Sequence, residues 1–103
     1  MANVLTVNPM RLTTVMATSY KAQVAASLGA LSTLRIEKIY WEKSTNTGDT
    51  LRINDPNSGT VLAEIISVQG GASYWIDWTA APKMWADFIV SQLDSGTLFI
   101  YTR

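Results

Sequence analysis

The chain has 103 residues, 48% hydrophobic and 16% charged, which suits one folded domain and is too apolar for a disordered chain. Eight basic residues balance eight acidic ones, so the net charge of zero argues against the strongly basic surface that binds nucleic acid. The sequence contains no cysteine and no histidine, which excludes disulfides, thiolate or imidazole catalysis and the usual zinc ligands.

The N-terminal part of the chain is predicted to be mostly extended. Residues 1–9 alternate weakly around Val4 and Leu5 and stop at a proline, which predicts a short edge strand or an N-terminal arm. Residues 11–20 are rich in β-branched side chains and carry few charges, so we expect a strand there. Residues 21–28 are rich in alanine, and a short helix competes there with an extended run.

The middle of the chain predicts a bent strand followed by a hairpin. Residues 33–43 form a strand whose apolar period slips by one residue near Lys38, as a β-bulge would cause. Residues 50–55 and 60–68 are strand-like runs on either side of the turn sequence 55–59. This arrangement predicts a hairpin with a loop of about five residues.

The last predicted element is a β-hairpin over residues 85–103. Residues 94–96 form an Asp-Ser-Gly loop, in which a type I turn followed by Gly96 in the left-handed region would reverse the chain. Counting from this loop gives the pairs Leu93–Thr97, Val90–Ile100, Gln92–Leu98, Ile89–Tyr101, Ser91–Phe99 and Asp87–Arg103. Both faces of such a ribbon carry large apolar side chains, so we expect a partner to cover one of them.

These elements together predict an all-β fold, either a small antiparallel β-sandwich or a jelly-roll-like barrel, with a short helix near residues 21–28 as the one helical option. Strands recur roughly every 8–12 residues with turn sequences between them, which is typical of such folds. We expect a single domain over residues 1–103. No apolar run reaches the ~18–20 residues that span a bilayer, and the first residues do not read as a signal peptide, so a soluble protein made in the cytosol is expected.

The acidic residues do not form a recognisable catalytic or metal-binding motif. Asp49, Asp55 and Asp94 lie in predicted turns, where aspartate side chains accept hydrogen bonds from nearby backbone groups. The strand glutamates alternate with apolar residues, as on a solvated face. The spacing of a calcium loop is absent, and no glycine-rich segment continues into the Lys-Ser/Thr of a phosphate loop. We therefore expect no catalysis, no cofactor and no bound metal.

Aromatic side chains are abundant for a chain of this length, and three explanations remain open for them. They can fill the core, form subunit contacts or stack on a sugar ring. Residues 73–78 form a compact aromatic strand in which Trp75 and Trp78 are three positions apart. A strand places such residues on opposite faces, so one of the two should be exposed or lie in an interface.

Three segments of the sequence resemble the strand-and-turn layout of small β-rich virion proteins of tailed bacteriophages. They are an aromatic-ended strand, a Gly-Asp-Thr strand that leads into a turn, and a Ser-Gly-Thr-Leu hairpin: Ile36–Trp41, Thr47–Asp55 and Leu93–Tyr101. The resemblance implies a capsid cement or decoration protein, or a tail component, that acts by binding. The alanine-rich segment of residues 22–30 departs from that layout.

The resemblance also implies partners and a location. We expect a homotrimer that binds the major capsid protein in the virion after synthesis in the host cytoplasm, with no nucleic acid or membrane as partner. The residues expected at interfaces are Val4, Leu5, Trp75, Trp78 and Trp85. The alternative is a carbohydrate-binding or tail-associated host-recognition module, in which an exposed tryptophan would stack on a glycan.

Overall fold

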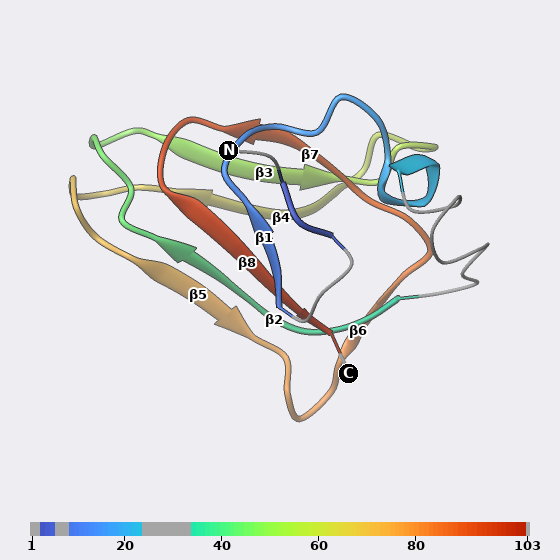
Figure 1. Cartoon of the computed structure of the whole chain (residues 1–103). Coiled ribbons are helices and arrows are strands. Elements are labelled where there is room, and N and C mark those ends of the chain that lie inside the picture. Colours follow the sequence, from blue (N-terminus) through green and yellow to red (C-terminus); the bar gives the residue numbers. More distant parts are fainter. Residues whose placement is uncertain (1–2, 6–8, 24–33, 103) are drawn as a thin grey trace.

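Two antiparallel sheets pack face to face in the computed structural model, which describes residues 3–5, 9–23 and 34–102 (Figure 1). The strands of sheet A run in the order β1 (Met10–Leu12), β8 (Thr97–Thr102), β2 (Leu34–Glu42) and β5 (Tyr74–Asp77), and β6 (Lys83–Trp85) also pairs with β2. The strands of sheet B run in the order β4 (Val61–Ile66), β3 (Thr50–Asn54) and β7 (Ile89–Leu93). The predicted all-β sandwich is confirmed.

The central strand of sheet A is the long strand β2. It pairs with β8 along one edge and with β5 and β6 along the other. Its register with β8 shifts between Ile36 and Lys38, so the predicted β-bulge is confirmed at the predicted place. Beyond the bulge, Ile39 and Trp41 are buried and Tyr40 between them faces outward.

The hairpin predicted in the middle of the chain is confirmed as β3 and β4. Arg52 pairs with Glu64 and Ile53 with Ala63. The turn is closed by Asp55, whose N–H donates to the Thr60 carbonyl at 2.8 Å and whose carboxylate accepts the Asn57 N–H at 2.8 Å. This use of aspartate as a turn residue is the one expected from the sequence.

The predicted C-terminal hairpin is wrong, because β7 and β8 belong to different sheets. Strand β7 pairs with β3 in sheet B, and β8 pairs with β1 and β2 in sheet A. Residues 94–96 therefore cross from one sheet to the other, although Gly96 has the predicted left-handed backbone with φ of 73°. The pairs counted between residues 89–93 and 97–101 do not form. Val90 and Leu93 of β7 and Leu98 and Ile100 of β8 are instead buried together in the core.

Contacts with distant segments hold this crossing in place. The Trp41 indole N–H donates to the Ser95 carbonyl at 2.8 Å, and the Thr50 N–H donates to the Asp94 carboxylate at 2.8 Å. Arg103, the predicted partner of Asp87, lies outside the described residues. The Asp87 carboxylate accepts the N–H groups of Lys21 and Phe88.

The N-terminal segment covers one edge of each sheet. Val4 exchanges two backbone hydrogen bonds with Arg11, of 2.8 and 2.9 Å, and so lies along β1. The strand expected over residues 11–20 is wrong beyond Leu12. That stretch turns instead toward sheet B, where the N–H groups of Met16 and Tyr20 donate to carbonyls of residues 90 and 88. Both groups are thereby satisfied at the edge of β7.

A short helical segment follows this stretch. Residues 20–23 are helical, which agrees with the start of the helix considered near residues 21–28. The rest of that predicted segment, residues 24–28, lies outside the described residues.

The core lies between the two sheets and is built from apolar side chains that alternate along the strands. Phe88 lies at its centre, with its ring stacked on Tyr20 at 5.2 Å and packed against Trp85 at 5.6 Å. The largest fully buried apolar side chains among the described residues are Trp41, Phe88, Leu12, Ile36, Ile39, Leu51, Ile53, Leu98, Ile100 and Val90. Members of this set come from both sheets, so the core holds the two layers together.

Candidate binding surfaces

The outer face of sheet A carries a row of side chains that crosses four strands. The register pairs Arg11 with Phe99, Phe99 with Tyr40, and Tyr40 with Trp75. The ring centroids of Tyr40 lie 6.1 Å from Phe99 and 5.7 Å from Trp75. We call Phe99, Tyr40, Trp75 and the neighbouring Tyr101 the aromatic face. Trp75 is its most accessible member, with 66% of its surface exposed.

A lysine lies beside this aromatic face. The Lys38 ammonium is 4.8 Å from the Tyr101 ring centroid and 5.6 Å from that of Trp75, within the range of cation–π attraction. Asp77 is directly opposite Lys38 across the strand pair. Hydrogen bonds from the Thr79 hydroxyl and N–H lower the pKa of Asp77, and the charge of Lys38 lowers it further. The Asp77 carboxylate therefore stays charged at neutral pH.

An open depression of about 380 Å³ lies at the end of the aromatic face, where it meets the loop before β5. Its lining residues are Tyr40, Ser73, Tyr74 and Trp75. The Ser73 hydroxyl oxygen accepts the N–H of Lys43 at 3.0 Å, which fixes its position at the rim. The depression therefore combines two accessible aromatic rings with a positioned hydroxyl.

A second apolar surface lies along β4, the outer strand of sheet B. Val61 and Ile66 are 49% and 54% exposed, and Val68, just beyond the strand, is 77% exposed. We call these three residues the aliphatic edge. Among the described residues β4 pairs only with β3, whereas the edges of β1 and β7 are covered by the N-terminal segment. An apolar strand edge left open is a common site of association between chains.

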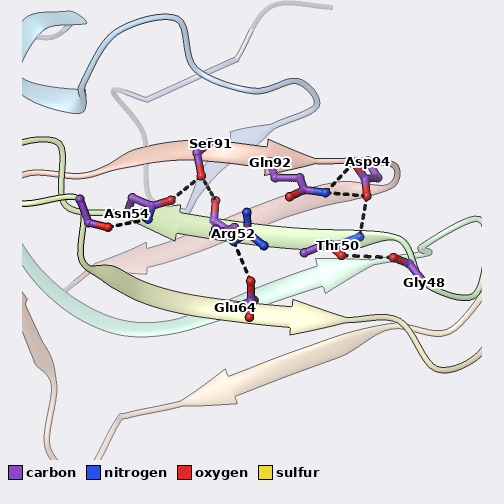
Figure 2. Close-up of polar contacts among 9 residues, drawn as sticks. Gly48, Thr50, Arg52, Asn54, Glu64, Ser91, Gln92 and Asp94 are labelled. Atoms are coloured by element: carbon purple, nitrogen blue, oxygen red, sulfur yellow. Dashed lines mark hydrogen bonds and ion pairs between the residues drawn. The ribbon is translucent and has the colours of Figure 1, made fainter.

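Polar side chains contact one another across the three strands of sheet B (Figure 2). The Arg52 Nε atom lies 2.6 Å from the Glu64 carboxylate, and the Ser91 hydroxyl donates to the Asn54 side chain. The Gln92 amide donates to Asp94 farther along the same face. These groups are paired with one another and half-exposed or exposed, so this face has the character of an ordinary solvated surface.

Polar side chains also join the loops at one end of the sandwich. The Ser95 hydroxyl donates to the Asp49 carboxylate at 2.6 Å and accepts the Thr45 N–H at 2.8 Å. Behind them, the hydroxyls of Ser44 and Ser67 are buried and 2.9 Å apart. Every buried side-chain nitrogen and oxygen of the described residues has a hydrogen-bond partner. This end of the molecule is therefore a hydrogen-bonded structural network.

The acidic member of this network predicts a response to acid. The Ser95 hydroxyl and the Asn46 N–H lower the pKa of Asp49 in the folded protein. The ionised carboxylate therefore stabilises the fold fully above the unfolded pKa of about 3.9. This stabilisation is lost as the pH falls through the lower folded pKa. Ser95→Ala removes the largest cause and should raise that pKa. The check is an NMR titration of the Asp49 carboxyl in both proteins. An unchanged pKa in Ser95→Ala would contradict the assigned cause.

The residues predicted at interfaces are not brought together. Leu5 and Trp85 are buried in the core, and Val4 is half-buried against β1. Trp78 is half-buried with its ring 6.0 Å from that of Trp85, so these two form one internal cluster. Trp75 alone of the five projects from the surface. The prediction that Trp75 and Trp78 lie on opposite faces, with one of them exposed, is confirmed.

Sequence reasoning missed the aliphatic edge and most of the aromatic face. The outward position of Tyr40 was predictable from the sequence, because Tyr40 stands between Ile39 and Trp41 in an alternating run after the bulge. The exposure of Val61 and Ile66 was not predictable from the sequence, because it results from the position of β4 at the outside of sheet B.

No other type of site emerges from the described part of the chain. It contains no cluster of three or more acidic side chains that would hold a metal ion. None of its helical residues forms a helix long and apolar enough to cross a membrane. Comparison with family models, curated proteins and solved structures found no match to this chain.

Proposed function

We propose that this chain is a structural virion protein that binds and stabilises a phage capsid shell as a cement or decoration protein, without catalysis. The observation that supports this most is the open aliphatic edge of β4. The chain uses its own N-terminal residues to cover the edges of β1 and β7, yet leaves exposed apolar residues along β4. The sequence resemblance to small phage virion proteins is the reason for proposing a phage capsid shell as the assembly.

The proposed contact is strand addition. A segment of the major capsid protein lies along β4, receives its outward backbone hydrogen bonds and covers Val61, Ile66 and Val68. Burying a valine or isoleucine side chain is worth roughly 1.5–3 kcal/mol, so one copy binds weakly and a symmetric assembly multiplies the effect. Three copies around a threefold axis of the shell form the proposed unit.

The acidic residues support a binding role over a catalytic one. Asp49, Asp55 and Asp94 each accept backbone N–H groups within or between loops. Glu64 is paired with Arg52 on the solvated outer face of sheet B. Each of these carboxylates therefore has a structural partner in the fold.

Val61→Lys should reduce binding to shells by about tenfold or more, because a charged side chain replaces an apolar one that the contact buries. Val15→Lys is the matched control, since Val15 has the same exposed fraction of 49% but lies away from β4. The measurement is co-sedimentation with emptied shells of the phage whose genome carries the sequence. Equal binding by both variants would rule out the aliphatic edge as the contact.

The same samples test the proposed trimer. Light scattering should give a mass three times the 11.3 kDa of one chain. A monomer that does not sediment with shells at all would overturn the virion assignment, and a shell-binding monomer would overturn only the trimer.

A further inference from the structure

We propose that the depression beside Trp75 binds one or two residues of a neutral pyranose sugar. This role goes beyond shell attachment, and it uses a different sheet. The depression belongs to sheet A, whereas the aliphatic edge belongs to sheet B. A sugar site here would let the protein recognise glycans in addition to holding its place in an assembly.

The walls of the depression suit a sugar ring. Tyr40 and Trp75 meet with 5.7 Å between centroids and 56° between ring planes, so they form an angled pair of aromatic surfaces. A pyranose presents a face of C–H groups with partial positive charge, which are attracted to the negative face of an aromatic ring. The volume of about 380 Å³ is at the small end of ligand sites, which run from about 300 to 1,000 Å³.

The exposure of Trp75 distinguishes it from the other aromatic residues of this surface. Phe99 and Tyr40 stack on each other at 6.1 Å and 24°, and both are half-buried. Trp75 ends the row, with 66% of its surface in contact with solvent. A tryptophan held this open by a regular strand gives a ligand a ready platform that needs no rearrangement.

The polar part of the site points to hydroxyl recognition. The Ser73 oxygen is held by the Lys43 N–H, so its own proton is directed to another acceptor. Among the described residues no group accepts that proton. A sugar hydroxyl at the rim would accept it and fix the orientation of the ring on Trp75.

The charges around the depression favour a neutral ligand. None of the four lining residues is a carboxylate or an ammonium group. The Lys38 ammonium lies over the rings of Trp75 and Tyr101, and Lys38 is opposite Asp77. An acidic sugar or a nucleic acid would require a basic group in the lining of the depression.

The test is titration of intrinsic tryptophan fluorescence with glucose, galactose, mannose, N-acetylglucosamine and short oligomers of each. At least one neutral sugar should give a saturable change with a dissociation constant in the millimolar range. Trp75→Ala should abolish the change, and Ser73→Ala should weaken binding by about 3- to 10-fold through the lost hydrogen bond. Met84→Ala is the control, since Met84 is 57% exposed on β6 of the same sheet.

Ser73→Leu provides a second variant that leaves Trp75 in place as a reporter. It should fill the depression and block the sugar without removing the ring. The proposal is overturned if no neutral sugar gives a saturable change, or if the change persists in Trp75→Ala and Ser73→Leu. A response confined to sialic acid or to an oligothymidylate would also overturn it. None of these outcomes bears on shell binding, which the Val61 and Val15 variants test separately.

Discussion

Replacing Gly96 with alanine is expected to destabilise the protein by about 3 kcal/mol or more. Gly96 has φ of 73°, a region where a residue with a Cβ loses roughly 1–2 kcal/mol. The added Cβ would also lie 2.4 Å from the Glu42 carbonyl oxygen and 3.0 Å from the Trp41 indole nitrogen. A backbone carbonyl cannot move aside easily, so the strain adds to the conformational cost.

Gly59→Ala isolates the conformational part of this effect. Gly59 has φ of 75°, almost the same as Gly96, but a Cβ added there would meet no atom within 4 Å. It should therefore lose only about 1–2 kcal/mol. The check is urea unfolding of both variants, with the free energy extrapolated to water. Equal losses would mean that the crossing between the sheets relaxes around the new methyl group.

Phe88→Ala is expected to cost about 3–5 kcal/mol, because it leaves a cavity at the centre of the core. The Phe88 ring contacts both Tyr20 and Trp85. Its removal therefore loosens the N-terminal stretch that contains Tyr20, along with the core. For a domain of about this size, that loss corresponds to a fall in Tm of at least about 12 °C.

Phe99→Ala provides the comparison for this change. Phe99 is also an aromatic residue of a strand, but it faces outward and is half-buried against Tyr40. We expect it to lose less than half as much stability as Phe88→Ala in the same thermal unfolding experiment. A larger loss at Phe99 would show that the aromatic face, and not the core, carries the stability of sheet A.

The parts of the fold that the sequence predicts are those decided by neighbours along the chain. The bulge in β2 follows from the slip in the apolar period, and the β3–β4 hairpin follows from the turn chemistry of Asp55 and Gly59. The opposite facing of Trp75 and Trp78 follows from strand geometry alone. In each case the deciding residues are close in sequence.

The wrong predictions concern segments whose structure is determined by contacts with residues far away in the sequence. The loop of residues 94–96 has turn chemistry that serves a hairpin and a sheet-to-sheet crossing equally well. The choice is made by contacts with Trp41 and Thr50, which are about half the chain away. The stretch after Leu12 likewise has strand composition, but it leaves sheet A and forms backbone hydrogen bonds at the edge of β7.

The candidate surfaces were predictable to a smaller extent. An exposed tryptophan in residues 73–78 was expected from spacing, and Trp75 fits it. Tyr40 and Phe99 join Trp75 only because β8, β2 and β5 are neighbours in sheet A. Exposure of Val61 and Ile66 depends on which strand lies outermost, which is a property of the whole topology.

The position of β8 between β1 and β2 has a consequence for synthesis on the ribosome. Strand β1 pairs only with β8 among the named strands, yet β8 is made about 85 residues later. At roughly 5–20 residues per second, β1 waits on the order of 10 s for its partner. During that interval the edge of β2 that β8 will occupy has no strand beside it. In that stage an unpaired strand edge of sheet A is open to pairing with another copy of the chain.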